Sequence, residues 1–300
     1  MTQQPDAEKK LIQRHFNGKA GAYESSAILQ REVGRQMLQR LDYVALKPKV
    51  ILDIGCGTGL GVQSLMKRYR HASVLAVDIS PGMLQQTRRK STWWRKPSLI
   101  CGDAESLPLA DNSVDLVHSN LMLQWCESEK VFAELLRVLR PQGLLMFSTF
   151  GPDTLKELRY SWSQVDRNTH VNQFTDMHIL GDELMRAGFA SPVMDMDVTQ
   201  LTYQHAFDVM NDLKSIGANT LRQRAHKGLV THNKISRVCT AYEQFRQNGV
   251  LPASFEIVFG HAWKSTARSK QAVADVHVAV DRIGHVVKPV GTAVLNKLIK

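Results

Sequence analysis

The sequence predicts an α/β fold, with a doubly wound and mostly parallel sheet and a helical lid inserted in its C-terminal half. Short aliphatic runs alternate with amphipathic segments through the first 150 residues, which is the pattern of parallel strands joined by helices. The aliphatic run at 50–54 suits a strand that is buried on both faces. It leads directly into a loop with glycine at positions 55, 57 and 59, where a ligand can approach the backbone closely.

The order of the elements follows from periodicity and from turn residues. Pro81 stands where the first turn of a helix tolerates proline, and Pro141 and Gly143 are expected to close a later helix. In the first half, strands are expected at 49–54, 73–77, 98–101, 114–119 and 144–150, and helices at 60–69, 82–90 and 129–139. After residue 151 the rhythm changes, with helices expected at about 178–187, 205–216 and 234–247 and strands at 193–198 and 254–263.

The loop after the first strand reads Asp53-Ile-Gly-Cys-Gly-Thr-Gly59, and two common glycine loops do not match it. A dinucleotide-binding loop would need glycine at position 60 or 62, where the chain has Leu60 and Val62. A phosphate-binding loop would need a lysine that is missing here. The D-x-G-x-G-x-G pattern resembles motif I of the class I S-adenosylmethionine-dependent methyltransferases, whose cofactor has no phosphate. The resemblance implies S-adenosylmethionine as the cofactor and a Rossmann-like sheet of seven strands, of which the last is antiparallel.

Polar side chains at the ends of successive strands predict where this cofactor binds. Asp53, Asp78, Asp103 and Asn120 fall at or just past strand ends, and in a parallel sheet these ends share one rim. Asp78 can accept both hydroxyl groups of a ribose, and its competing role is that of a helix N-cap. By the resemblance Asp103 would read the adenine, with a turn as its alternative role; Met83 would pack on the adenine or in the core. The predicted cofactor site comprises Asp53, Gly55, Gly57, Gly59, Asp78, Ile79, Met83, Asp103, Ala104 and Asn120, and we predict no metal ion in it.

Several later segments are more specific than motif I. The run His170-Val-Asn-Gln-Phe-Thr-Asp-Met-His178 is unusual, and so is Phe255-Glu-Ile-Val-Phe-Gly-His-Ala-Trp263. Together with segments at 192–197, 201–203, 213–214, 217–219 and 241–243, they resemble the malonyl-acyl-carrier-protein O-methyltransferases of biotin synthesis (the BioC family). The likeness covers about residues 10–264. It implies that the free carboxylate of malonyl-acyl carrier protein becomes a methyl ester, early in the formation of the pimeloyl chain.

The implied reaction needs little acid–base chemistry from the protein. A carboxyl group with a pKa of about 4 is already ionised at pH 7, so the main tasks are in-line placement at about 3 Å and exclusion of water. The resemblance gives residues 1–48 as a helical flap over the cofactor. A methyltransferase domain is expected at 49–263, including lid helices at about 152–190 and 205–250. The candidate catalytic residues are Tyr23, Gln124, His170, Asn172 and Phe174, each with a structural role as its alternative.

The chain is basic, with a net charge of +10, and residues 264–300 form a basic tail of unknown role. A second basic cluster lies between Lys67 and Lys96. Besides a plain solvated surface, this charge suits an acidic protein partner, nucleic acid or an anionic membrane surface. Asn120 is followed by Leu-Met-Leu instead of the proline pair of adenine-N6 methyltransferases, which argues against nucleic acid. Since an acyl carrier protein is strongly acidic, we expect malonyl-acyl carrier protein as the partner and no nucleic acid.

Other sequence features indicate the compartment. No stretch approaches the ~20 apolar residues of a membrane span, and the first ten residues lack the apolar core of a signal peptide. The four cysteines show no paired spacing. We therefore expect a cytoplasmic protein without a membrane span.

Two alternative functions stay open from the sequence. One is a quinone-type C-methyltransferase, which would need a base to deprotonate its substrate. The other is an assembly factor that binds S-adenosylmethionine and acts on a partner protein without methylating a metabolite. Turnover of a malonyl thioester distinguishes the implied function from both.

Overall fold

The computed structural model describes residues 5–21, 23, 27–91, 94–215 and 231–266 of the 300-residue chain. Residues up to Thr266 belong to one compact unit. Of the predicted basic tail, only Lys264 and the two residues after it are described, and the rest lies outside the described residues. Within the described ranges, no helix is both long enough and apolar enough to span a bilayer.

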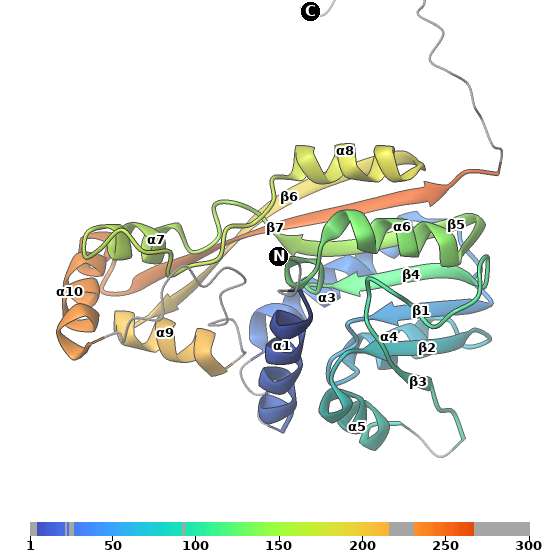
Figure 1. The fold of residues 1–300 in the computed structure, drawn as a ribbon, viewed down its shortest axis with the longest axis horizontal. Helices are drawn as coiled ribbons and strands as arrows, with labels where there is room; N and C mark the ends of the chain where they lie inside the picture. Colours follow the sequence, from blue (N-terminus) through green and yellow to red (C-terminus); the bar gives the residue numbers. More distant parts are fainter. Residues whose placement is uncertain (1–4, 22, 24–26, 92–93, 216–230, 267–300) are drawn as a thin grey trace, which may run out of the picture. The chain divides into compact units, whose positions relative to one another are not determined.

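One seven-stranded sheet forms the centre of this unit, in the order β3-β2-β1-β4-β5-β7-β6 (Figure 1). The strands β1 to β5 run parallel, whereas β7 is antiparallel to both of its neighbours, β5 and β6. The predicted sheet, mostly parallel with an antiparallel last strand, is confirmed. The strands are β1 (Val50–Ile54), β2 (Ser73–Asp78), β3 (Ser98–Cys101), β4 (Val114–Asn120), β5 (Leu139–Phe150), β6 (Phe189–Tyr203) and β7 (Leu251–Lys264).

Helices cover the two faces of the sheet (Figure 1). On one face, α3 (Ile28–Arg40), α4 (Leu60–Arg68) and α5 (Pro81–Arg89) contribute to a buried apolar cluster. On the other face, α6 (Ser128–Val138) and α8 (Met177–Ala187) contribute to a second cluster, through Phe132 and Leu184 among others. The remaining helices are α1 (Pro5–Lys19), α7 (Lys156–Ser163), α9 (Ala206–Ser215) and α10 (His232–Tyr242), with short 3-10 helices at Leu41–Tyr43, Leu123–Trp125 and Glu243–Phe245.

The starts of the helices follow the predicted capping chemistry. The Ser80 hydroxyl accepts a hydrogen bond from the Met83 backbone N–H (3.2 Å), and Pro81 is the first residue of α5. The Asp176 side chain caps α8 in the same way, and that helix ends at Gly188, whose φ of 103° is left-handed. These capping contacts fix where α5 and α8 begin, and therefore where the chain turns back over the sheet.

The bounds of β5 and β6 differ most from the prediction. β5 begins at Leu139 instead of residue 144, because α6 ends at Val138 and the chain pairs with β4 at once, through Leu139 and Val114. Pro141 and Gly143 therefore lie inside the strand, next to an irregularity in its pairing with β4. The strand expected at 193–198 is the middle of the much longer β6, which pairs with β7 from Phe189 to Tyr203 apart from one irregularity.

The extra length of β6 and β7 explains the lid region. β5 ends opposite Ile257, but β6 and β7 remain paired as far as Tyr203 and Leu251. This two-stranded extension passes the edge of the main sheet, and α7, α9 and α10 lie along it (Figure 1). The lid region expected at about 152–190 therefore has two separate parts. α7 lies on the extension, whereas α8 packs against α6 and β6.

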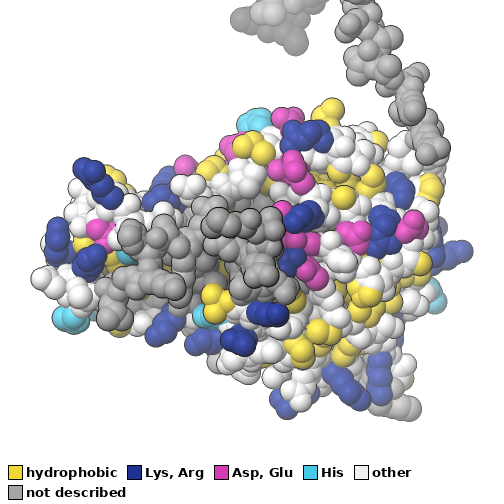
Figure 2. Space-filling model, in the orientation of Figure 1, with side chains coloured by type: hydrophobic (Ala, Val, Ile, Leu, Met, Phe, Trp, Pro, Cys, Tyr) yellow, Lys and Arg dark blue, Asp and Glu magenta, His cyan; other side chains and the backbone are white. Residues whose placement is uncertain are grey.

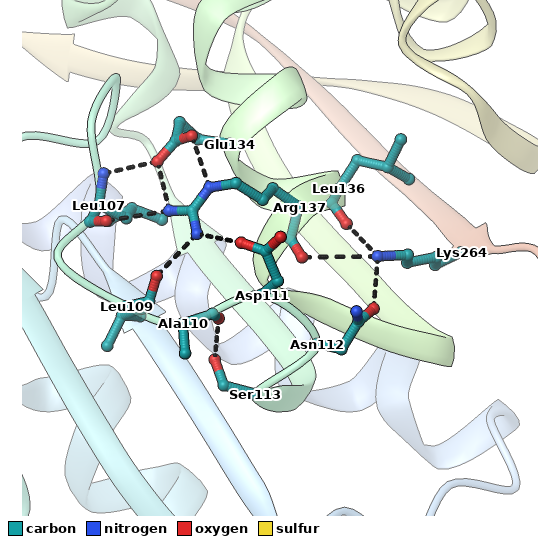
Figure 3. Close-up of polar contacts among 10 residues, drawn as sticks. All are labelled: Leu107, Leu109, Ala110, Asp111, Asn112, Ser113, Glu134, Leu136, Arg137 and Lys264. Carbon is teal, nitrogen blue, oxygen red and sulfur yellow. Dashed lines mark hydrogen bonds and ion pairs between the residues drawn. The ribbon is translucent and has the colours of Figure 1, made fainter.

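A polar network fixes the connection between β3 and β4 (Figure 3). The Arg137 guanidinium donates two hydrogen bonds to Glu134 (2.8 Å each) and one to Asp111 (2.7 Å). Arg137 also donates to two backbone carbonyls of the segment 107–113, which is thereby held against the end of α6. Lys264, the last residue of β7, donates to the Leu136 carbonyl in the last turn of α6 (2.7 Å). The network therefore stabilises the loop between β3 and β4.

Candidate active site

A cavity opens at the carboxyl ends of β1, β2 and β4, beneath α1. Its position is the one where parallel sheets bind ligands, beyond the carboxyl ends of strands whose connections leave in opposite directions. The lining residues come from α1, Tyr23, the ends of β1, β2 and β4 with the segments that follow them, the segment after β3, and α5. They are Lys9, Ile12, Phe16, Tyr23, Ile54, Gly55, Gly57, Val77, Asp78, Ile79, Met83, Gly102, Asp103, Ala104, Asn120, Leu121, Met122, Trp125 and Cys126.

The glycine loop follows the shape of this cavity. Gly55 and Gly57 have left-handed φ angles of 68° and 54°. A Cβ atom on Gly55 would lie 2.3 Å from the Met122 side chain, whereas one on Gly57 would project into open space. Any side chain at Gly57 would therefore occupy the cavity itself, which explains why this wall is bare backbone. Gly59 does not line the cavity; a Cβ there would lie 2.7 Å from the Thr87 side chain, and its role is to let α4 pack against α5.

Asp78, at the end of β2, is a buried carboxylate that faces the cavity. One oxygen accepts the Gly57 N–H (2.9 Å) and the other accepts the Ser80 N–H (2.8 Å). Burial raises the pKa of Asp78 to about 6, although the two backbone hydrogen bonds act in the opposite direction. The bonds hold the glycine loop to the end of β2, and the carboxylate keeps free lone pairs for hydroxyl donors in a ligand.

Asp103, just after β3, lines the cavity but already has a charged partner. Its Oδ2 atom lies 2.6 Å from Lys9 Nζ, and Oδ1 accepts the Glu105 N–H (3.0 Å). Lys9 also lies 2.6 Å from the Glu105 carboxylate. Among the described lining residues Lys9 is the single Lys or Arg. Lys9 was not among the predicted site residues, although its spacing of four residues from Gln13 is typical of one face of a helix.

Asp53, like Gly59, is a predicted cofactor-site residue that lies apart from the cavity. Its side chain lies behind the glycine loop, 2.8 Å from Nδ1 of His118 on β4, and is not among the described residues that line the cavity. Gly61, in the first turn of α4, passes so close that a Cβ would lie 2.9 Å from Asp53 Oδ2. Ile79, Met83, Ala104 and Asn120 all line the cavity as expected.

Tyr23 closes the cavity together with two other aromatic side chains. Phe16 makes edge-to-face contacts with Tyr23 and with Trp125, at centroid distances of 6.3 and 5.5 Å. Burial, and then the negative charge of Asp78, raise the pKa of Tyr23 above its ordinary value. Tyr23 therefore keeps its proton at neutral pH and can act as a hydrogen-bond donor in the cavity.

Gln124 and Phe174 line a second cleft of about 310 Å³, beside the first. The two clefts share Cys126. Gln124 accepts from the Thr149 hydroxyl (3.3 Å) and donates to the Leu121 carbonyl (2.6 Å), so its amide is held at the ends of β4 and β5. A substrate whose reacting group lies at the first cavity could extend into this second cleft.

His170 and Asn172 are engaged in the lid. His170 stacks on Trp162 at 3.6 Å between ring centroids, and its Nε2 lies 2.8 Å from Asp166, which also pairs with Lys234 (2.7 Å). The Asn172 carbonyl accepts from a guanidinium of α7 (3.5 Å). Among the residues that the structure describes, these two do not line either cleft. Their contacts tie α7 to α10.

The basic cluster at 67–96 lies away from both clefts. Lys67 and Arg68 are in the last turn of α4, and Arg88 and Arg89 are in the last turn of α5. Both helices start at the rim of the sheet and contain nine residues, so their last turns lie about 12 Å from it. Figure 2 shows Lys and Arg side chains spread over the visible face instead of gathered at one place. The positive charges of the cluster interact favourably with the partial negative charge at the C-terminal ends of the two helices. They do not border the cavity.

Comparison with known proteins agrees with this geometry. Residues 52–147 match the family model described as a methyltransferase domain. Two solved structures share the fold: a putative methyltransferase from Bacillus halodurans (TM-score 0.55, 18% identity, 77% of this chain and 100% of that one) and the YcgJ protein from a Bacillus (TM-score 0.54, 17% identity, 78% and 99%).

Curated relatives are much more similar in sequence. A malonyl-acyl-carrier-protein O-methyltransferase from Gallionella capsiferriformans is 47% identical over 268 residues, which is 87% of this chain and 92% of the relative. One from Methylovorus is 46% identical over 87% of this chain and 90% of the relative, and one from Legionella pneumophila is 35% identical over 91% and 96%. The chain therefore belongs to the family of the malonyl-acyl-carrier-protein O-methyltransferases.

Proposed function

We propose that this protein transfers a methyl group from S-adenosylmethionine to the free carboxylate of malonyl-acyl carrier protein and so forms a methyl ester. The observation that carries the proposal is the identity of up to 47% with relatives of that name over most of both chains. The cavity at the strand ends gives this activity a place in the molecule. By the resemblance set out above, the ester belongs to the early part of biotin synthesis.

The residues around the cavity fit the cofactor. Asp78 offers a buried carboxylate for the two ribose hydroxyls, and Asp103 and Ala104 border the region where an adenine would lie. Gly57 presents bare backbone, and the described lining has no cluster of cations of the kind that binds phosphate. When bound, S-adenosylmethionine supplies the electrophilic methyl group.

The protein's own residues place and desolvate the reactants. The substrate carboxylate is ionised at neutral pH, so the mechanism needs no general base. Phe16, Tyr23 and Trp125 exclude water from the reacting groups. The opposite charges of carboxylate and sulfonium cancel during the reaction, so a dry site favours the transition state over the charge-separated reactants. Tyr23, which stays protonated, donates a hydrogen bond that orients a substrate oxygen.

The other candidate residues have supporting roles in this proposal. Gln124 and Phe174 border the cleft that receives the thioester side of the substrate. His170 and Asn172 hold the lid in position through their contacts with Asp166 and α7. Asp53 supports the glycine loop from behind. The substrate arrives on an acidic carrier protein in the cytoplasm, and nucleic acid has no part in the reaction.

Mass spectrometry of the carrier protein tests the proposal. Malonyl-acyl carrier protein incubated with the enzyme and S-adenosylmethionine should gain the mass of one methyl group. The acetyl and unacylated carriers, which lack the carboxylate, should gain none. Asp78→Ala should abolish the gain, and Asp182→Ala, an exposed aspartate on α8, should leave it intact. Methylation of the acetyl carrier, or no methylation of the malonyl carrier, would refute the proposal.

A further inference from the structure

Helix α1 covers the cofactor cavity and is attached to it by a regular series of polar side chains. Lys9, Gln13 and Asn17 are four residues apart and therefore lie along one side of the helix. Lys9 and Gln13 bind residues of the cavity wall, and Asn17 binds the start of α5. Two apolar residues one position before, Ile12 and Phe16, line the cavity itself.

The contact nearest to β3 is electrostatic. The Lys9 ammonium lies 2.6 Å from both the Asp103 and the Glu105 carboxylates. Burial by itself lowers the pKa of Lys9, but its bonds to these two acids outweigh that effect and raise it. The lysine therefore stays charged when α1 is in place. With its side chain 22% exposed, the ion pair is accessible to salt.

The other two contacts are hydrogen bonds to the loop between β2 and α5. Gln13 Nε2 donates to the Ile79 carbonyl (2.7 Å). Asn17 Oδ1 accepts from the Ser80 hydroxyl (2.7 Å) and from the Gly82 N–H (2.8 Å). A Cβ on Gly82 would lie 2.9 Å from Asn17 Oδ1, so the close approach of α1 depends on this glycine. The first turn of α5 is therefore capped from α1 as well as by Ser80 itself.

With α1 in this position, several of the surfaces that a ligand would touch are buried, while the Asp103 side chain is 31% exposed. Ile12 is 4% exposed, Asp78 8% and Met83 1%. Phe16 lies against Trp125 on the opposite wall (5.5 Å between ring centroids). These contacts place α1 directly over the surfaces that a nucleoside would occupy.

We propose that Lys9, Gln13 and Asn17 form a latch that holds α1 over the cofactor, and that cofactor and product exchange through undocking of this helix. The proposal rests on the proposed function for the identity of the ligand. It adds the residues that set the rate of exchange. Because the latch contains an ion pair, it also makes exchange sensitive to salt.

The dissociation rate of S-adenosylhomocysteine tests the latch. Stopped-flow tryptophan fluorescence can follow release, since Trp125 lies against Phe16 of α1. Lys9→Gln should accelerate release at least about tenfold, the effect expected from loss of a partly buried charge pair. Arg14→Gln is the matched control, because Arg14 is exposed on the same helix. It should release the product as the unmodified protein does. Added salt should accelerate release from the unmodified protein and have little effect on Lys9→Gln.

Hydrogen exchange of the ligand-free protein provides a second readout. Amides of α1 should exchange faster in Lys9→Gln and in Asn17→Ala than in Arg14→Gln, while the strands exchange as before. Release from Lys9→Gln at the same rate as from Arg14→Gln, with normal binding by the unmodified protein, would overturn the latch and leave the methyl-transfer proposal intact. Failure of the unmodified protein to bind S-adenosylhomocysteine would overturn both.

Discussion

Asp53 and His118 occupy directly paired positions on β1 and β4, and Asp53 Oδ1 lies 2.8 Å from His118 Nδ1. The two side chains are 3% and 1% exposed. Neither Asp53 Oδ2 nor His118 Nε2 has a hydrogen-bond partner among the described residues. Within the described part of the chain, each side chain therefore has the other as its single polar contact, at the point where the glycine loop leaves the sheet.

Removal of the imidazole should be costly because it leaves a buried carboxyl group with no partner at either oxygen. We expect His118→Ala to lower the free energy of unfolding by about 3–5 kcal/mol, the usual cost of breaking a buried pair from one side. Urea unfolding followed by circular dichroism measures it. His178→Ala is the control, because His178 is 80% exposed beside Asp176 and should change stability little. Equal stability of the two variants would show that the buried pair contributes nothing.

The raised pKa of Asp78 predicts a pH dependence of cofactor binding. Hydroxyl donors need the ionised carboxylate, and burial raises the pKa of this group to about 6 in the ligand-free protein. The Kd for S-adenosylmethionine should be constant above pH 7 and rise about tenfold per pH unit below 6. Isothermal titration between pH 5 and 8 measures this. Asp78→Asn should bind more weakly and lose the acid limb. A constant Kd for the unmodified protein down to pH 5 would contradict the assignment.

The same shift affects the stability of the ligand-free protein. Because the folded pKa of about 6 exceeds the ordinary value of 3.8, protonated Asp78 stabilises the fold below pH 3.8, and this contribution is lost as the pH rises through 6. The stability lost between pH 4 and pH 7 amounts to about 2 kcal/mol. Asp78→Asn, which cannot ionise, should therefore gain stability relative to the unmodified protein as the pH rises. A constant difference between the two proteins across this range would count against the shift.

Two glycines should respond in opposite ways to alanine. A Cβ on Gly151, directly after β5, would lie 2.4 Å from the Glu256 side chain, which accepts the Asp153 N–H (2.7 Å). Gly151→Ala should destabilise the protein by about 1–3 kcal/mol through overpacking where the lid begins. Gly181, inside α8, has only an ordinary contact at 3.7 Å with Met194, so Gly181→Ala should stabilise by about 0.5–1 kcal/mol. Thermal unfolding of both variants checks the signs, and a stabilised Gly151→Ala would show that the junction is not tightly packed.

Much of the fold could be read from local signals. The strand β1 and its glycine loop, Pro81 at the start of α5, and the switch of rhythm after Gly151 are each encoded within a few residues. The position of Asp78 beside the cavity was also predictable, because ligands bind beyond the carboxyl ends of the strands in such a sheet. The lengths of β6 and β7 were not, since their extension beyond the sheet depends on pairing between segments about fifty residues apart.

The partners of the site residues could not be read from the sequence. Asp53 stands at the position of a site residue, yet its contact is His118, 65 residues away on the neighbouring strand. Lys9 reaches Asp103 across 94 residues. His170 stood in a segment typical of the family, but its stacking on Trp162 depends on how α7 packs on the extension. These are tertiary contacts, and a periodicity in one segment holds no information on them.

The most direct test of the account identifies the atom that receives the methyl group. Malonyl-acyl carrier protein can be incubated with the enzyme and S-adenosylmethionine labelled in its methyl group, and then treated with mild alkali. A methyl ester releases labelled methanol, so we predict release of one equivalent per malonyl group and none from the acetyl carrier. Label that stays on carbon after alkali, or no transfer from a protein that binds the cofactor, would contradict carboxylate methylation.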